Sequence, residues 1–326
     1  MSENHRARSV GIGRAHAKAI LLGEHAVVYG APALALPVPQ LTVTASAGWS
    51  TRAPGDPGGV SFTMTGSPSR PMMTQASDSL SRLTAEFKTA MGVTDSPRLD
   101  VIIDGAIPHG RGLGSSAACA RAVVFALADL YGRDLSESAA FDLVQTAENV
   151  AHGRSSGVDA RAVGATAPLL FQAGRASEAS IGCDGLFIIA DSGVVGRTKD
   201  AVELLREGFQ RHTGAQERFV RRATQLTDEA GHALAGGRPQ QLGARLTDYH
   251  DLLRAAGLST PRIDRLVEAA LTAGSLGAKI TGGGLGGCVL ALTQPVQARE
   301  VTARLHEAGA VQTWAVPLRG LADHAR

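Results

Sequence analysis

Residues 108–118 read Pro-His-Gly-Arg-Gly-Leu-Gly-Ser-Ser-Ala-Ala, with glycine at every second position from Gly110 to Gly114. Because glycine has no side chain to block close approach, such a loop can turn its backbone amides towards an anion. An alanine-rich segment follows and predicts a helix over 116–131, whose first amides and dipole favour phosphate. The sequence therefore predicts a phosphate-binding loop formed by Pro108, Gly110, Gly112, Leu113, Gly114, Ser115, Ser116, Ala117 and Ala118.

The two serines of this loop allow two interpretations. A hydroxyl of Ser115 or Ser116 could cap the helix, or it could bind Mg²⁺, a hard cation that prefers oxygen ligands. The loop is not a P-loop, because GxxxxGK[ST] is absent, and it does not fit GxGxxG. An ordinary helix entry with local caps is the alternative to a phosphate site.

Composition narrows the class of protein. The chain has 326 residues, more than one hydrophobic core usually organises, which favours two domains. Its 44% of hydrophobic and 19% of charged residues are typical of a globular protein. A formal net charge of +2 and only 4% of aromatic residues argue against nucleic acid as a partner.

The spacing of the cysteines and the lack of long apolar segments indicate in which cellular compartment the protein is expected. Cys119, Cys183 and Cys288 lie far apart and form no CxxC pair, which favours buried thiols in a reducing cytosol. The first ten residues, MSENHRARSV, lack the apolar core of a signal peptide, and no stretch approaches the roughly 18 apolar residues of a membrane span. We expect a cytoplasmic protein without a membrane partner.

Apolar runs and helical spacing alternate irregularly along the chain. Strands are predicted at 19–22, 33–36, 41–47, 60–64, 99–103, 186–190, 288–292 and 311–316, and a hairpin tip or loop is predicted at 50–59. Helices are predicted over 74–91, 116–131, 136–152 and 295–308, with three more before residue 273. This irregular mixture favours an α+β fold over a doubly wound sheet. A small, polar stretch at 174–184 suggests domains at 1–180 and 181–326.

Several charged residues interrupt apolar segments. Lys18 precedes an apolar strand, and Glu24-His25 break a hydrophobic run, so their burial would require partners. Glu148 and His152 are four positions apart and share a helix face, and Asp159 follows a Ser/Gly turn. Each alone is more often a capping, paired or solvated residue. Together with two glycine loops they favour phosphoryl transfer, which needs a cation, a metal ligand and an acid.

Three segments in order resemble motifs of the GHMP kinases. These are 18–30, which contains GEHAVVYG, then 112–118, and then 279–288 with its run of glycines. Between them, 148–159 is similar to the acid–HGxPSGxD segment of that family, and 191–198 to its DTG…T strand and loop. The chain departs from the family pattern at His16-Ala17, which replace Pro-Gly, and at Ser155, Gly283 and Leu285.

The resemblance implies a two-domain α+β fold with the active site in the cleft between the domains. GEHAVVYG most resembles the members that phosphorylate mevalonate, so ATP, mevalonate and Mg²⁺ are the implied partners, with a homodimer left open. Asp159 and Lys18 would be catalytic, and Ser116 and Glu148 would bind the metal. The substrate-binding residues would be Glu24, His25, Arg197 and Thr281.

Three rival functions remain open. Another GHMP kinase could act on phosphomevalonate or homoserine, although a second substrate phosphate would need additional Lys or Arg near the pocket. The related decarboxylase is disfavoured because Lys18 is present. A catalytically inactive sensor of the same fold should have lost its lysine or its acid, whereas Lys18, Glu148 and Asp159 are all retained.

Overall fold

The computed structural model describes residues 9–50, 59–65, 70–94, 97–152 and 155–319. Their contacts divide the chain into two units that are not continuous in sequence. Unit 1 comprises Met1–Ala17, Leu41–Ile107 and Ser115–Gly164; unit 2 comprises Lys18–Gln40, Pro108–Gly114 and Ala165–Arg326. The boundary that the sequence suggests after residue 180 rests on a different criterion and stays a prediction.

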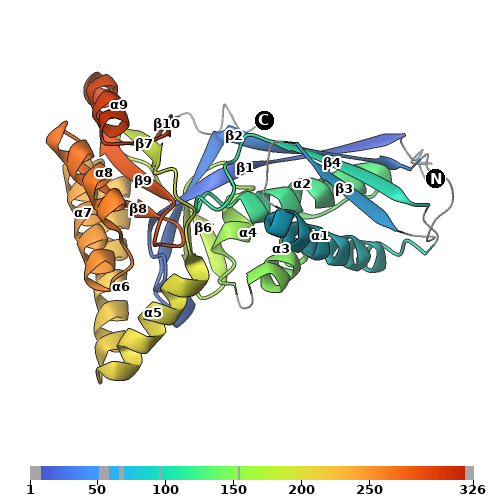
Figure 1. Cartoon of the computed structure of the whole chain (residues 1–326), viewed down its shortest axis with the longest axis horizontal. Helices are drawn as coiled ribbons and strands as arrows, with labels where there is room; N and C mark the ends of the chain where they lie inside the picture. The colour runs from blue at the N-terminus through green and yellow to red at the C-terminus, as the bar shows by residue number, and fades with distance from the viewer. Residues whose placement is uncertain (1–8, 51–58, 66–69, 95–96, 153–154, 320–326) are drawn as a thin grey trace. The chain divides into compact units, whose positions relative to one another are not determined.

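Unit 1 combines a sheet with helices (Figure 1). Strand β4 (Leu99–Gly105) pairs antiparallel with β2 (Ala33–Trp49) over residues 43–49 and parallel with β3 (Val60–Met64). Helices α1 (Arg70–Ala90), α2 (Ser115–Leu130) and α3 (Glu137–His152) pack against one another, and the short α4 (Val158–Ala162) follows. Leu80, Leu83 and Phe87 follow helical spacing and are buried, while Met91 is half-buried.

Two features of unit 1 depend on small or capping residues. Gly13 of β1 (Val10–Leu22) faces α2 so closely that a Cβ atom there would lie 2.0 Å from the Ala122 carbonyl oxygen. Glycine at this position therefore lets the helix pack directly on the strand. Ser136 caps α3, since its hydroxyl accepts a hydrogen bond from the amide of Ala139 at 3.2 Å. The helix predicted over 136–152 therefore begins with a side-chain cap.

Unit 2 contains a four-stranded antiparallel sheet in the order β10-β7-β9-β8. The strands are β7 (Leu186–Asp191), β8 (Gly277–Thr281), β9 (Cys288–Thr293) and β10 (Gln312–Pro317). Its helices are α5 (Thr198–Arg211), α6 (Ala215–Ala235), α7 (Pro239–Ala255), α8 (Pro261–Thr272) and α9 (Ala298–Glu307), of which α7, α8 and α9 pack on this sheet (Figure 1). A hairpin of β5 (Leu169–Gln172) and β6 (Arg175–Glu178) pairs with the first residues of β2.

The α+β class is confirmed, but several elements differ from the predictions. Four helices rather than three lie between β7 and residue 273, because only residues 212–214 separate α5 from α6. The hairpin β5–β6 and strand β8 were not predicted, and β1 begins at Val10 rather than Ala19. The two strands predicted at 33–36 and 41–47 form one strand, β2. Most of the predicted loop 50–59 lies outside the described residues.

Prolines explain the error at β2. Pro37 and Pro39 lack amide hydrogens and usually interrupt a strand. Here they fall between the residues that pair with β5, 33–35, and those that pair with β4, 43–49. The pairings with β4 and β5 therefore do not require their missing amides, and β2, which also pairs with β1, continues through both prolines.

Candidate active site

The glycine loop at 108–114 has the backbone that a phosphate site requires. Gly110, Gly112 and Gly114 have φ values of 68°, 76° and 73°, in the left-handed region that favours glycine. Left-handed residues alternating with others can turn successive amides to the same side. Two backbone bonds fasten the loop within unit 2: the amide of Lys18 donates to Leu113 at 3.0 Å and that of Gly196 donates to Gly110 at 2.8 Å.

The second glycine loop, residues 282–287, packs directly against the first. A Cβ atom on Gly282 would lie 2.5 Å from Cα of Gly112, so both positions need glycine. This loop also contains two of the departures noted in the sequence. Leu285 has φ 56°, an unusual conformation for a leucine, and a Cβ on Gly283 would lie 1.9 Å from Oγ1 of Thr198. The glycine at 283 therefore leaves room for Thr198.

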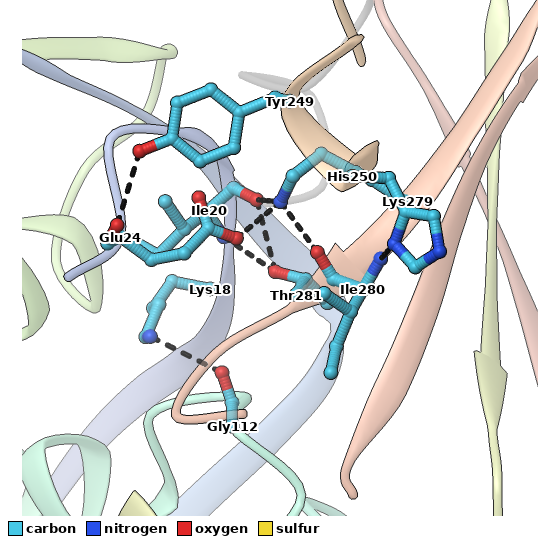
Figure 2. A network of polar contacts seen from close by, with 9 residues as sticks. All are labelled: Lys18, Ile20, Glu24, Gly112, Tyr249, His250, Lys279, Ile280 and Thr281. Atoms are coloured by element: carbon cyan, nitrogen blue, oxygen red, sulfur yellow. Dashed lines mark hydrogen bonds and ion pairs between the residues drawn. The ribbon is translucent and has the colours of Figure 1, made fainter. Parts of the chain in front are cut away.

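Lys18 lies beside the first glycine loop (Figure 2). Its side chain is buried, and Nζ donates a hydrogen bond to the carbonyl oxygen of Gly112 at 3.1 Å. Burial of Lys18 thus comes with a hydrogen-bonding partner, as the sequence required. A cation is thus held at the loop predicted to bind phosphate.

Glu24 has a buried partner that sequence reasoning missed (Figure 2). Lys279, in the middle of β8, donates from Nζ to the Glu24 carboxylate and to the carbonyl oxygens of Ile20 and Ile280. Both side chains are buried, Lys279 completely. Burial raises the pKa of Glu24 and lowers the pKa of Lys279, and the pairing opposes both shifts. The sequence signal that could have identified this partner is the single charged residue in the segment GAKIT.

His25 adopts a conformation that few residues other than glycine favour. Its φ is 63°, and its Nε2 is buried without a hydrogen-bond partner among the described residues. Burial, followed by the charge of Lys279, lowers the pKa of His25 to about 4. The ring is therefore neutral at neutral pH. An orphaned ring nitrogen on a strained turn is a reasonable contact for a ligand.

Thr281 and Arg197 occupy very different surroundings. The hydroxyl of Thr281 is fully buried, donates to the carbonyl of Ile20 at 2.9 Å and accepts from the amide of Ile20 at 3.0 Å, so it joins β8 to β1 (Figure 2). Arg197 precedes α5, with 62% of its side chain exposed, and pairs with Asp200 at 3.3 Å. Their predicted contacts with substrate stay predictions.

A second buried ion pair supports the first glycine loop and was also not predicted. The guanidinium of Arg111 contacts the carboxylate of Asp191 at 2.9 Å, and both side chains are largely buried. Asp191 in addition accepts a hydrogen bond from the amide of Gly193 at 2.8 Å. The loop and the end of β7 are thereby connected.

In unit 1, Glu148 faces the first turns of α2. Glu148 is only 5% exposed, and Cys119 of α2 has a pKa raised to about 12, first by burial and then by the negative charge of Glu148. Cys119 lies three residues after Ser116, so the two share a helix face. Glu148 therefore acts on the face of α2 that also carries Ser116, the second residue of the helix.

This arrangement tests whether Mg²⁺ suits the residues present. Mg²⁺ commonly uses one or two protein carboxylates together with phosphate oxygens and water. A carboxylate and a serine hydroxyl supply only oxygen, and the exposed Ser116 is open to a ligand. The donor set therefore fits the ion.

Asp159 lies in the first turn of α4 and is half-buried. The preceding turn is fastened to α3: Gln145 donates to Oγ of Ser155 at 2.7 Å, and the amide of Ser155 donates to Asn149 at 3.0 Å. Ser155 replaces a proline of the family pattern, and these bonds hold the turn by another means. The side chain of His152, which precedes this turn, lies outside the described residues.

Across the described ranges, none of the helices combines the length and the apolar character needed to cross a membrane.

Comparison with known proteins gives consistent matches. Models of the GHMP kinases N terminal domain and of the GHMP kinases C terminal domain match residues 78–165 and 230–311. The mevalonate kinase of Pyrococcus horikoshii is 31% identical, over 91% of this chain and 92% of its own, and that of Aeropyrum pernix is 32% identical, over 84% and 86%. The crystal structure of L. major mevalonate kinase in complex with R-mevalonate aligns with a TM-score of 0.82 at 25% identity, over 97% of this chain and 98% of that chain.

Proposed function

Because the chain belongs to the GHMP kinase family, we propose that it transfers the γ-phosphoryl group of ATP to the primary hydroxyl of mevalonate, giving 5-phosphomevalonate. The observation that carries a kinase activity is the buried Lys18, whose ammonium group lies 3.1 Å from Gly112 in a loop of left-handed glycines. Relatives named mevalonate kinases match most of the chain and support the choice of acceptor. A cytoplasmic location and domains at 1–180 and 181–326 belong to the same proposal.

The glycine loop and the start of α2 bind the phosphates of ATP. The residues assigned are Pro108, Gly110, Gly112, Leu113, Gly114, Ser115, Ser116, Ala117 and Ala118. The first amides of α2 have no partner within the helix and carry its positive dipole end. They therefore suit an anion.

Glu148 and Ser116 hold Mg²⁺. Bound there with ATP, the ion would neutralise charge on phosphate oxygens. Glu148 supplies a negative charge from a buried position, and Ser116 supplies a neutral oxygen at the helix start. One carboxylate is sufficient, because phosphate and water complete the coordination of Mg²⁺ in sites of this kind.

Asp159 and Lys18 act on the transferring group. A primary alcohol has a very high pKa, so a carboxylate cannot deprotonate it fully before attack at pH 7. In a loose transition state the attacking oxygen needs little negative charge early, so Asp159 orients the hydroxyl and accepts its proton late. The ammonium of Lys18 offsets the negative charge of the phosphoryl group.

Four residues contact or shape the mevalonate site. Among the residues that the structure describes, Nε2 of His25 and Oε2 of Glu24 have no hydrogen-bond partner. Arg197 is the candidate partner of the mevalonate carboxylate, because a guanidinium binds a carboxylate in a bidentate manner. The hydroxyl of Thr281 is hydrogen-bonded to Ile20. We therefore propose that Thr281 positions the end of β1 and does not contact mevalonate directly.

One experiment tests the acceptor. ATP consumption is measured with mevalonate, phosphomevalonate, homoserine and galactose at equal concentration, and the product is identified by phosphorus NMR. Mevalonate should turn over fastest and yield a phosphomonoester at its primary carbon. Faster turnover of another acceptor would overturn the substrate while leaving the kinase, and no turnover of any alcohol would overturn the kinase.

A further inference from the structure

Arg111 lies in the first glycine loop and directs its side chain into the protein. It stands between Gly110 and Gly112, whose backbones are left-handed, and only 17% of its side chain is exposed. Its Nε donates to Oδ2 of Asp191 at 3.0 Å and lies 2.9 Å from Oδ1. A side chain of the loop is thus anchored to the end of β7, within the same unit.

Asp191 also anchors the segment that follows β7. Its Oδ1 accepts a hydrogen bond from the amide of Gly193 at 2.8 Å. Three residues further on, the amide of Gly196 donates to the carbonyl oxygen of Gly110 at 2.8 Å. Two consecutive residues of the glycine loop are therefore fastened to residues 191–196, one through its side chain and one through its backbone.

Stability alone is a poor explanation for this ion pair. Burying two charges costs free energy, and apolar side chains of similar volume often serve a fold as well. The pair is also incompletely satisfied, because Nη1 of Arg111 is buried and has no hydrogen-bond partner among the described residues. A guanidinium held to a carboxylate does, however, fix the direction of the residue that carries it.

A phosphate site needs this fixed direction more than the fold does. Backbone amides bind an anion best when they already point towards it, so that nothing has to be reorganised on binding. Glycine permits the left-handed turns of the loop, but it also leaves the backbone free to rotate. The anchored side chain between Gly110 and Gly112 restricts that rotation without adding a Cβ atom to either glycine.

We propose that Asp191 and Arg111 are a positioning pair that fixes the amides of residues 110–114 for the phosphates of the nucleotide. The inference rests on the proposed function, because it takes this loop to bind ATP. Arg111 acts through the backbone of the loop and does not touch phosphate itself. Removal of either partner should therefore weaken the binding of ATP and ADP but spare adenosine, which has no phosphate.

The test compares Arg111→Met, Asp191→Leu and the double variant. Each should bind ATP and ADP, both with Mg²⁺, about 10–100-fold more weakly, the equivalent of losing one hydrogen bond to a charged group. The double variant should lose no more than either single variant, because both changes break the same contact. Calorimetry measures the Kd of ATP and of ADP, and competition with ATP measures that of adenosine, all without an acceptor alcohol.

The melting temperature separates positioning from a purely structural role. Each single variant leaves one largely buried charge without its partner, so both should melt at a lower temperature than the wild type. The double variant replaces both charged side chains by apolar ones and should recover most of this loss. Its affinity for ATP should not recover, because apolar packing does not direct the loop.

Arg245→Met is the matched control. Arg245 lies in the same unit, is partly buried and joins α7 to α6 by pairing with Glu229 at 2.7 Å. The variant removes an arginine from an ion pair between two helices. It should lower the melting temperature slightly and leave the binding of ATP, ADP and adenosine unchanged.

Three results would overturn the positioning role. These are recovery of ATP affinity together with the melting temperature in the double variant, wild-type ATP affinity in Asp191→Leu, and an equal loss of adenosine and ATP binding. Should a single variant not fold, the double variant decides: weak ATP binding supports the proposal, and wild-type binding rejects it. A wild type that does not bind ATP would overturn the proposed function as well, whereas the three results above leave that function intact.

Discussion

The acidic residues of unit 1 and the buried charged residues of unit 2, Glu24 and Lys279, are brought together in opposite ways. Glu148 and Asp159 lie eleven positions apart, on α3 and at the start of α4, and a short turn that is hydrogen-bonded to α3 connects them. Glu24 and Lys279 are 255 positions apart and meet only because β1 and β8 come together. Local sequence positions the first group, and the tertiary fold positions the second.

This difference has a consequence for function. Asp159 is half-buried and Ser116 exposed, so groups in unit 1 can exchange water for substrate or metal at small cost. Lys18, Glu24 and Lys279 are buried, so each charge needs compensation within the protein. Substitutions in unit 1 should therefore act on one chemical role at a time, whereas those in unit 2 should act on one another.

The largest expected effect is the removal of the acid. Asp159→Asn should lower kcat about 10²–10⁴-fold, the usual contribution of a positioned base, with ATP affinity nearly unchanged. Lys18→Met should cost about as much. If both groups act on one transition state, the double variant should lose far less than the product of the single losses. Steady-state kinetics and nucleotide titration measure these effects.

Asp134→Asn, at an exposed position of the same unit, is the control and should leave kcat unchanged. Strictly multiplicative losses would show that Asp159 and Lys18 work independently, and the shared mechanism would have to be abandoned. Unchanged kcat in Asp159→Asn would remove the carboxylate from the reaction altogether.

The same contrast explains which features the sequence could predict. Helix α1 follows local periodicity, α2 is rich in alanine, and α3 begins with a side-chain cap. The glycine loop is visible because glycine alternates over a few residues. The partner of Glu24 could not be predicted because it lies on β8, and β8 is hard to recognise in the sequence: the charged Lys279 interrupts the apolar run in GAKIT. Likewise, only the pairing pattern of β2 reveals that Pro37 and Pro39 are tolerated.

The metal site provides the second largest effect. Glu148→Gln removes the negative charge but keeps the shape of the side chain. Loss of a residue that only supports a metal ligand typically weakens metal binding about 10–100-fold, so the Mg²⁺ concentration for half-maximal rate should rise at least that much. The melting temperature should stay close to that of the wild type. Direct Mg²⁺ titration of the ATP complex by calorimetry provides a readout that does not depend on turnover.

Asp142→Asn on the same helix is the matched control, because Asp142 is exposed. It removes one negative charge from α3 without touching the assigned ligand. Equal Mg²⁺ dependence in Glu148→Gln and in the wild type would contradict the ligand role of Glu148 and favour a purely structural acid.

The smallest effect is expected at Arg197, the candidate partner of the substrate carboxylate. Its side chain is 62% exposed and shared with Asp200, so it should contribute less than a buried cation. A hydrogen bond to a charged group is worth about 1.5 kcal/mol at the low end, so Arg197→Ala should raise KM for mevalonate about tenfold and leave KM for ATP nearly unchanged. Arg206→Ala is the matched control, because Arg206 is an exposed arginine of α5 paired with Glu203 at 2.7 Å. It should change neither constant. If Arg197→Ala raised both constants equally, the arginine would act on the fold of the 191–198 segment rather than on the substrate carboxylate.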